Sequence, residues 1–264
     1  MLYQEKVIWV VGASSGIGKA LAIEFSKQKC KIVVSSRNEK ELNIVKTECE
    51  NNGSECIVIP LDLTQIDTFE NKTKQVIEKF HFIDVLIVNG GISQRSLIIE
   101  TPLEIDRKIM EVNYFGNISI TKTVLPYMQK QKSGQIATIS SIVGVFGFPL
   151  RSAYSSSKHA LHGFYETLRA EHKKDNINVS VVIPGRVKTN VSLNAINKDG
   201  AAHGELDDGQ VNAMSSEEFA KKMIKALSKN KKEILIGGKE LLMVYFRRYL
   251  PFIFYNIVTK IKST

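Results

Sequence analysis

Three residues in the middle of the chain have the types and the spacing for proton transfer. Tyr154 follows Ser141 by thirteen residues, and Lys158 comes four residues after Tyr154. Side chains four apart share one face of a helix, so a helix here would place an ammonium beside a phenol. A phenol has a pKa near ~10 in water, and a fixed ammonium lowers that pKa. We therefore expect Tyr154 to exchange a proton near neutral pH, with the Ser141 hydroxyl holding a carbonyl or alcohol oxygen beside it.

The same residues also fit a purely structural interpretation, because a tyrosine and a lysine four apart occur by chance in many helices. Asn113 presents a similar choice, since it lies in an apolar helical stretch, Glu111–Gly116. Asparagine is a poor residue for a helix interior. A buried asparagine needs hydrogen-bond partners, so Asn113 is expected either at a structural kink or as the holder of an ordered water.

A glycine-rich loop follows the first apolar run, Val7–Val11, and precedes a helical stretch at Lys19–Lys29. Such loops let the backbone approach a phosphate closely, and the helix N-terminus adds unpaired N–H donors. The spacing G-x-x-x-G-x-G alone is also compatible with a tight turn. Its position after the first strand favours a dinucleotide cradle. The residues predicted to form it are Gly12, Ser14, Ser15, Gly16, Ile17 and Gly18.

The end of the second predicted strand indicates which dinucleotide binds. An acidic residue at this point would bind the ribose 2′-hydroxyl of NAD, whereas an arginine accommodates the 2′-phosphate of NADP. This chain has Ser35-Ser36-Arg37 there and no acid. Arg37 therefore predicts NADP(H), with NAD as the less favoured cofactor; a solvated loop arginine is the alternative.

Three later motifs also follow predicted strands. Asp62-Leu63 comes after the third strand, and Asp62 is expected either to cap the next helix or to touch the adenine. Asn89-Gly90 comes after the fourth strand, where small residues let a ribose approach. The sixth strand ends in the stretch Pro184–Thr189. Each is a candidate segment for contact with the dinucleotide.

Strands and helices alternate along the chain, and this alternation predicts one α/β domain built on a doubly wound parallel sheet with helices on both faces. The expected strands are Val7–Val11, Lys31–Ser36, Cys56–Ile59, Val85–Val88, Gln135–Ser140, Ile177–Ile183 and Glu233–Ile236. The expected helices are Lys19–Lys29, Glu39–Asn51, Gln65–Phe80, Glu104–Gln131, Ala153–Lys174 and Ser216–Lys229.

Two segments lie outside this alternation. Residues 190–215 are polar and lack a clear period, and we expect them to form a substrate lid. Residues 1–238 would then form one dinucleotide-binding domain, and residues 239–264 an aromatic and basic helical extension. The stretch Leu241–Val258 is too short and too interrupted by arginines and a proline for a membrane span. It could lie on a membrane surface, cover the substrate pocket or pack against another subunit.

The composition is that of an ordinary soluble protein. The 264 residues are 43% hydrophobic and 24% charged, and the formal net charge is +9. No compact basic motif gathers this charge, so a solvated surface with an anion site is favoured over nucleic-acid binding. The three cysteines lack metal-ligand spacing and are expected to be reduced, which favours a cytoplasmic location. His159 and His162 are assigned surface or packing roles rather than metal binding.

Taken in order, these motifs resemble the short-chain dehydrogenase/reductase (SDR) family, from Lys6 to about Ile236. Two positions depart from the family's common pattern, Val11 where threonine is usual and Gly90 where alanine is usual. The tail after Gly238 looks like that of membrane-associated members of the family. The resemblance implies a Rossmann-type fold and a catalytic tetrad, which would comprise Asn113, Ser141, Tyr154 and Lys158.

The resemblance also assigns roles. Tyr154 would be the general acid/base, and Ser141 would orient the substrate oxygen. Lys158 would lower the phenol pKa and bind the nicotinamide ribose, and Asn113 would hold a water that relays protons to it. The segment with Pro184, Val187 and Thr189 would anchor the carboxamide.

The expected function is NADP(H)-dependent hydride transfer between the nicotinamide and a carbonyl or secondary alcohol. An NAD-dependent alcohol dehydrogenase and a non-catalytic dinucleotide sensor are the alternatives. The substrate is expected to be a hydrophobic small molecule, because Val145, Phe146, Phe148 and Pro149 follow Ser141. A homodimer or homotetramer is expected, paired through long helices.

Overall fold

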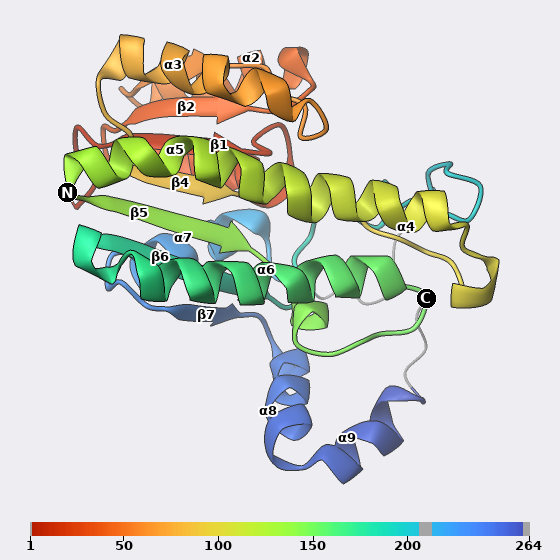
Figure 1. Ribbon diagram of the computed structural model, residues 1–264. Helices are drawn as coiled ribbons and strands as arrows, with labels where there is room; N and C mark the ends of the chain where they lie inside the picture. The colour runs from red at the N-terminus through yellow and green to blue at the C-terminus, as the bar shows by residue number, and fades with distance from the viewer. Residues whose placement is uncertain (1, 206–212, 261–264) are drawn as a thin grey trace.

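The computed structural model describes residues 2–205 and 213–260 and contains a seven-stranded sheet (Figure 1). All six strand pairs are parallel, in the order β3-β2-β1-β4-β5-β6-β7. The strands are β1 (Val7–Val11), β2 (Lys31–Ser35), β3 (Glu55–Val58), β4 (Val85–Val88), β5 (Gly134–Ile139), β6 (Ile177–Pro184) and β7 (Glu233–Ile236). The predicted strands are confirmed, with boundaries shifted by at most one residue.

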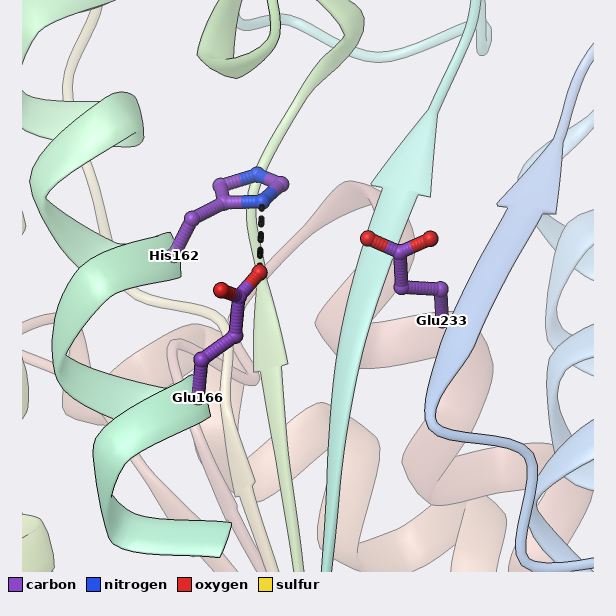
Figure 2. Close-up of side chains that lie close together, drawn as sticks. All are labelled: His162, Glu166 and Glu233. Carbon is purple, nitrogen blue, oxygen red and sulfur yellow. Dashed lines mark ion pairs between the residues drawn. The ribbon is translucent and has the colours of Figure 1, made fainter. Parts of the chain in front are cut away.

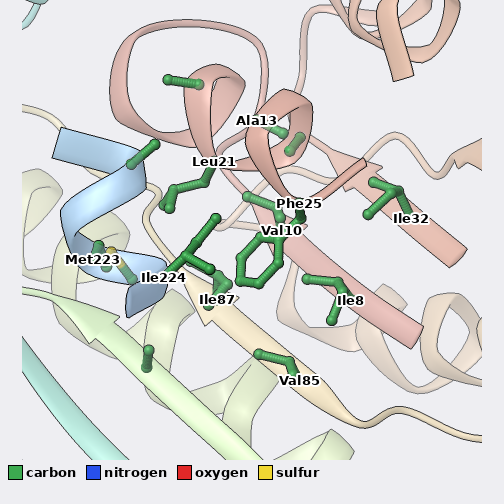
Figure 3. Close-up of a cluster of buried hydrophobic side chains, with 14 of the residues drawn as sticks. Ile8, Val10, Ala13, Leu21, Phe25, Ile32, Val85, Ile87, Met223 and Ile224 are labelled. Carbon is green, nitrogen blue, oxygen red and sulfur yellow. The ribbon is translucent and has the colours of Figure 1, made fainter. Parts of the chain in front are cut away.

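Helices cover both faces of the sheet. One face packs against α1 (Gly16–Ser26), α2 (Glu39–Asn51) and α7 (Ser216–Leu227). The other face packs against α3 (Phe69–Phe80), α5 (Asn117–Gln131) and α6 (Ser152–Glu171). The first of these layers is centred on Phe25, which Figure 3 shows among strand residues and α7 residues such as Ile224. A parallel sheet with both faces covered explains why its strands read as continuous apolar runs.

Local sequence signals account for the helix boundaries. Asn38 accepts from the backbone N–H of Glu41 over 3.3 Å and caps α2, and Ser215 does the same for Glu218 over 3.1 Å at the start of α7. Such side-chain caps satisfy N–H groups that have no partner within the helix. The first predicted helix, by contrast, begins three residues earlier than expected, at Gly16 within the glycine loop itself.

The long helix expected at Glu104–Gln131 is interrupted. The structure has α4 (Leu103–Met110), a π-helical turn at Glu111–Gly116, and then α5. Inside the turn the Asn113 side chain bonds to the backbone of Ile92, and Gly116 approaches the Leu63 carbonyl so closely that a Cβ would collide with it. The wide turn accommodates both contacts, as π-bulges at functional sites often do. The kink interpretation of Asn113 is therefore confirmed.

The strand order reverses between β1 and β4, which lie side by side in the centre of the sheet. The loops that leave these two strands lead to helices on opposite faces of the sheet, because β1 is followed by α1 and β4 by α4 and α5. Ligands of open α/β sheets bind at this point. The glycine loop, the Asn89-Gly90 turn and Ser141 all follow strands at this same edge.

The segment 190–215 has more order than its composition predicts where the structure describes it. Ile196 exchanges backbone hydrogen bonds with the segment after β4, donating to Ser93 over 2.8 Å and accepting from Arg95 over 2.9 Å. Part of the expected lid, residues 206–212, lies outside the described residues. Its role as a lid stays a prediction.

The C-terminal segment forms two short helices that project from the body, α8 (Leu242–Tyr249) and α9 (Pro251–Val258) (Figure 1). The break between them falls at Leu250, immediately before Pro251, whose ring cannot continue the preceding helix. Among the described residues, no helix has both the length and the apolarity needed to span a membrane.

Candidate active site

The glycine loop turns sharply between β1 and α1. Gly12 adopts φ +83°, and a side chain there would press on the backbone of Gly90 at 2.7 Å. Ser15 precedes the helix without a side-chain capping bond, and the first turn of α1 contains no acidic residue. The N–H groups of this turn are therefore suited to an anionic group, which the helix dipole also favours. This local geometry fits the phosphates of a dinucleotide.

The turn after β4 packs directly against this loop. Asn89 donates to the carbonyl oxygen of Gly12 over 2.9 Å and so fixes the two loops together. Gly90 is buried against Leu63, whose Cδ1 would lie 2.5 Å from an added Cβ. Asp62 lies in the turn after β3, where it accepts from the backbone N–H and the hydroxyl of Thr64, both over 2.9 Å, and it does not cap helix α3. Of the two alternatives for Asp62, helix capping is therefore wrong, and contact with the adenine stays a prediction.

The structure brings together the three residues predicted to transfer a proton, Ser141, Tyr154 and Lys158. Ser141 lies just after β5, and Tyr154 and Lys158 lie in the first two turns of α6. The Ser141 hydroxyl lies beside the Tyr154 phenol and lowers its pKa. Lys158 Nζ is 5.8 Å from the centroid of the Tyr154 ring, so the two side chains occupy one helix face as expected.

The electrostatics of this trio differ from the expectation. Burial raises the pKa of Tyr154, and the opposing influences come from Arg151, the Ser141 hydrogen bond and Arg95 rather than from Lys158. Lys158 is 4% exposed, and burial lowers its pKa to about 8. The predicted lowering of the phenol pKa by Lys158 is not seen, because burial of the phenol outweighs the groups that lower its pKa, and Lys158 is not among those groups.

Asn113 is fully buried and holds the backbone beside Lys158. Its Oδ1 accepts from the Ile92 N–H and its Nδ2 donates to the Ile92 carbonyl, both over 2.8 Å. Nδ2 also donates to Ser157 Oγ over 3.0 Å. A Cβ built on Gly91 would lie 3.1 Å from Asn113 Oδ1 and 3.5 Å from Lys158 Nζ, so both groups border the same small space. The water relay remains a prediction.

The segment after β6 reaches the glycine loop from the other side. Val187 is buried and pairs with Met214, and the Lys188 N–H donates to the Met214 carbonyl over 2.9 Å. Thr189 lies so close to Gly16 that an added Cβ would be 3.0 Å from its methyl group. Pro184 is the last residue of β6. The predicted segment thus borders the cradle.

Arg37 is exposed, one residue beyond Ser36 at the end of the second strand. This strand end adjoins the glycine loop, because the N–H groups of Gly12 and Ala13 both donate to the Ser35 carbonyl, over 2.7 and 3.1 Å. The Arg37 side chain is thus attached next to the cradle.

Sequence reasoning missed a buried residue that supports the catalytic helix. Gln94 accepts from the Ala153 N–H over 2.9 Å, at the first turn of α6, and donates to Thr101 over 3.1 Å. Asn117 was missed too; it donates to the Gly90 carbonyl over 2.9 Å. The sequence does offer a signal for Asn117, because its polar side chain lies four residues after Asn113 and so on the same helix face. Nothing in the sequence indicates that Gln94 is buried.

His162 lies one turn after Lys158 in α6, beside two carboxylates (Figure 2). Its Nε2 is 2.9 Å from Ser140 Oγ, and its Nδ1 is 4.0 Å from Glu166. Sequence reasoning found no carboxylate partners for it, but the structure supplies Glu166 and Glu233. Burial and then the nearby positive groups lower the pKa of His162 to about 4. The nearby positive groups would repel a metal ion, and the carboxylates of Glu166 and Glu233 are exposed. We therefore assign His162 a packing role and not a role as a metal ligand.

The sequence has well-defined relatives. A sequence profile described as short chain dehydrogenase matches residues 6–199. A protein of Anopheles gambiae named dehydrogenase/reductase SDR family protein 7-like is 38% identical, over 97% of this chain and 82% of its own length. Human dehydrogenase/reductase SDR family member 7 is 40% identical, over 94% of this chain and 75% of its own length.

Solved structures share the fold. An SDR from Burkholderia phymatum, in complex with NAD, superposes with a TM-score of 0.83 over 100% of this chain and 98% of that one, at 20% identity. An alcohol dehydrogenase from the archaeon Thermococcus sibiricus, complexed with 5-hydroxy-NADP, gives 0.76 over 89% of this chain and 97% of that one, at 23% identity. The expected fold is confirmed, and the sequence matches show that the chain is an oxidoreductase that belongs to the short-chain dehydrogenase/reductase family.

Proposed function

We propose that this protein is an NADP(H)-dependent oxidoreductase that interconverts a hydrophobic ketone and its secondary alcohol. The observation that carries the reaction class is the placement of Ser141 and Lys158 beside the Tyr154 side chain, with Lys158 on the same helix face. When bound, the nicotinamide supplies or accepts the hydride. The chain itself supplies a cradle for the phosphates, a proton and an orienting hydroxyl.

Tyr154 is the proton donor for reduction. Its raised pKa keeps the phenol protonated across the physiological range, so the proton that a developing alkoxide takes up is present at the start of the reduction. Ser141 holds the phenol and presents a second hydroxyl to the same oxygen. Lys158 and Asn113 border one space beside Gly91. Lys158 would replace the proton on the phenol, and a water held by Asn113 would return a proton to Lys158.

Arg37 carries the proposed preference for NADP(H). It is an exposed cation at the carboxyl end of β2, where the cradle adjoins the strand, and an exposed guanidinium there can bind a 2′-phosphate in bidentate geometry. Of the two solved structures with this fold, the Burkholderia phymatum protein was complexed with NAD and the Thermococcus sibiricus protein with 5-hydroxy-NADP. The fold therefore permits either cofactor.

The test is the rate of ketone reduction with each reduced cofactor, for the wild type and for Arg37→Asp. We expect the wild type to favour NADPH and the variant to lose at least about tenfold of that preference, because one charge-assisted contact contributes about 1.5–3 kcal/mol. Lys40→Asp, an exposed change of the same charge in helix α2, is the control. A wild type that favours NADH would establish the NAD-dependent alternative, and one that binds a cofactor but reduces no ketone would favour the sensor.

We also propose that the C-terminal helices contact an anionic membrane surface. Tyr245, Tyr249, Phe252 and Tyr255 are all more than half exposed, and Arg247 and Arg248 lie among them. Aromatic and basic side chains together suit the headgroup region of a bilayer. Co-sedimentation with phosphatidylserine vesicles should be lost in a Phe252→Ser, Arg248→Ser variant; equal binding by variant and wild type would exclude this surface.

The oligomer and the location are proposed on simpler grounds. A homodimer or homotetramer, paired through the long helices α5 and α6, fits closed symmetric assembly. All three cysteines are buried free thiols, which suits a reducing cytoplasmic compartment. Light scattering at several protein concentrations measures the oligomeric state, and microscopy of the tagged protein measures its location in the cell.

A further inference from the structure

At its start, the C-terminal segment contacts the body of the protein through the carboxylate of Glu240. Glu240 Oε1 accepts from the backbone N–H of Arg186 over 2.8 Å and from the N–H of Gly238 over 2.9 Å. Arg186 belongs to the segment after β6 that borders the cofactor cradle. The carboxylate therefore joins two parts of the chain that lie 54 residues apart in sequence.

The space around this carboxylate is shaped for it. Gly185 and Gly237 follow the paired ends of β6 and β7, where the Gly185 N–H donates to the Ile236 carbonyl over 2.8 Å. A Cβ on Gly185 would collide with Glu240 Oε1, and one on Gly237 would lie 2.6 Å from it. The carboxylate fills the gap between the two strand ends, and any side chain at either glycine would expel it.

The contact continues from Glu240 to the cradle along a short path. The backbone N–H of Arg186 is bonded to Glu240, and its carbonyl oxygen accepts from the Met214 N–H over 3.3 Å. Three residues further on, Thr189 packs against Gly16 of the glycine loop. A shift of the Arg186 backbone would therefore move both Val187 and Thr189, which the cofactor is proposed to contact.

The protonation state of Glu240 suits this role. Burial raises its pKa, but the N–H groups of Gly238 and Arg186 and the positive charge of Arg186 outweigh that effect, so the pKa lies below its ordinary value. The carboxylate is charged at neutral pH, and hydrogen bonds to a charged acceptor are stronger than neutral ones.

We infer that Glu240 is a positioning residue for the nicotinamide end of the cofactor site, through which the C-terminal segment fixes the backbone at Arg186. This inference rests on the proposed function, because it assigns the segment at Pro184–Thr189 to the cofactor. Glu240 does not touch the reacting atoms, and it acts through the N–H of Arg186.

The same C-terminal segment has a second contact, with the loop after Ser141. The Phe254 ring of α9 packs edge-on against Phe146 at 5.2 Å between centroids, and each residue is 3% exposed. Phe254 therefore supports the substrate side of the site and offers a comparison variant with a different expected outcome.

The first experiment is hydrogen exchange on the full-length protein without cofactor. In Glu240→Ala, the amides of Arg186 and Gly238 should exchange at least about tenfold faster than in the wild type, since each loses its acceptor. Glu240→Gln keeps an acceptor oxygen and should restore most of the protection. Glu233→Ala, a change of the same residue type at the far end of β7, should leave both amides unchanged. Unchanged exchange in Glu240→Ala would overturn the inference whether or not the protein binds NADPH.

The second experiment is binding and turnover with NADPH. Glu240→Ala should raise the Kd and the KM for NADPH about tenfold or more, with a small change in the KM for the ketone, whereas Phe254→Ala should raise the KM for the ketone and leave the NADPH Kd unchanged. A purely structural role would lower the Tm without this split between the two substrates. Wild-type protein that binds no NADPH would contradict the proposed function and, with it, the cofactor role of Glu240; tight wild-type binding that Glu240→Ala leaves intact would contradict the role of Glu240 alone.

Discussion

Lys158 Nζ donates to the backbone carbonyl oxygen of Ile139 over 2.8 Å. This bond connects the second turn of α6 to the last residue of β5, immediately before Ser140 and Ser141. The Lys158 carbonyl in turn accepts from Ser140 Oγ over 3.2 Å. Helix and strand are therefore joined twice at the point where the phenol and the serine hydroxyl must meet.

The buried amine gives the first prediction, a pH dependence of stability. Burial lowers the pKa of Lys158 from 10.5 to about 8, so between these values the unfolded chain binds more protons than the folded one. The free energy of unfolding must then rise with pH across that window, by an amount on the order of 3 kcal/mol from this group. Lys158→Met lacks the titration, so the stability of the wild type relative to the variant should increase from pH 8 to 10.5.

Chemical denaturation of both proteins across that pH range measures the difference between their free energies of unfolding. Groups that titrate in both proteins, such as Tyr165, contribute equally and cancel in this difference. Parallel curves for the wild type and Lys158→Met would show that the amine keeps its ordinary pKa in the folded protein.

Removing the Tyr154 hydroxyl tests the proton donor. We expect Tyr154→Phe to lower kcat by at least about a hundredfold, the usual contribution of a general acid, and to change the Kd for NADPH little. Tyr165→Phe is the matched control, because Tyr165 lies on the same helix and its hydroxyl bonds to Thr121 over 2.7 Å. That variant should lose some stability and keep its turnover. Equal activity in Tyr154→Phe and the wild type would assign the proton to another group.

Asn113→Ala should destabilise the fold as well as the reaction. The change leaves the partly buried N–H and carbonyl of Ile92 without the partners that Asn113 supplies, at a cost of about 2–3 kcal/mol. Asn43→Ala removes an amide that donates to the Glu39 carbonyl on an exposed helix surface, and should change stability by less than about 0.5 kcal/mol. Urea unfolding compares the two. A loss at Asn113 no greater than that at Asn43 would mean that the π-helical turn does not depend on this amide.

The parts of the fold that the sequence predicts are those governed by local periodicity and by loop chemistry. The apolar run Val7–Val11 predicts a strand that is buried on both faces of the sheet. Gly12 must be a glycine because its φ is +83° and a side chain there would collide with the backbone of Gly90. The spacing of Tyr154 and Lys158 likewise fixes their shared face once the helix forms.

The parts that could not be predicted depend on contacts between distant residues. The π-helical turn requires Ile92 to meet Asn113, and the role of Glu240 requires the ends of β6 and β7 to lie side by side. The direction of the Tyr154 pKa could not be predicted for a related reason, because burial of the phenol raises that pKa and the spacing of Lys158 does not reveal burial. Desolvation is set by the packed structure around the phenol.

The most direct test of the account is a fluorescence titration of the full-length wild-type protein with NADPH and, separately, with NADH. The cradle at Gly12–Gly18 and the exposed Arg37 beside it predict saturable binding of both, at least about tenfold tighter for NADPH. Binding of neither cofactor would contradict the account, because the residues of the glycine loop and of the Tyr154 site would then lack the partner that gives them a common function.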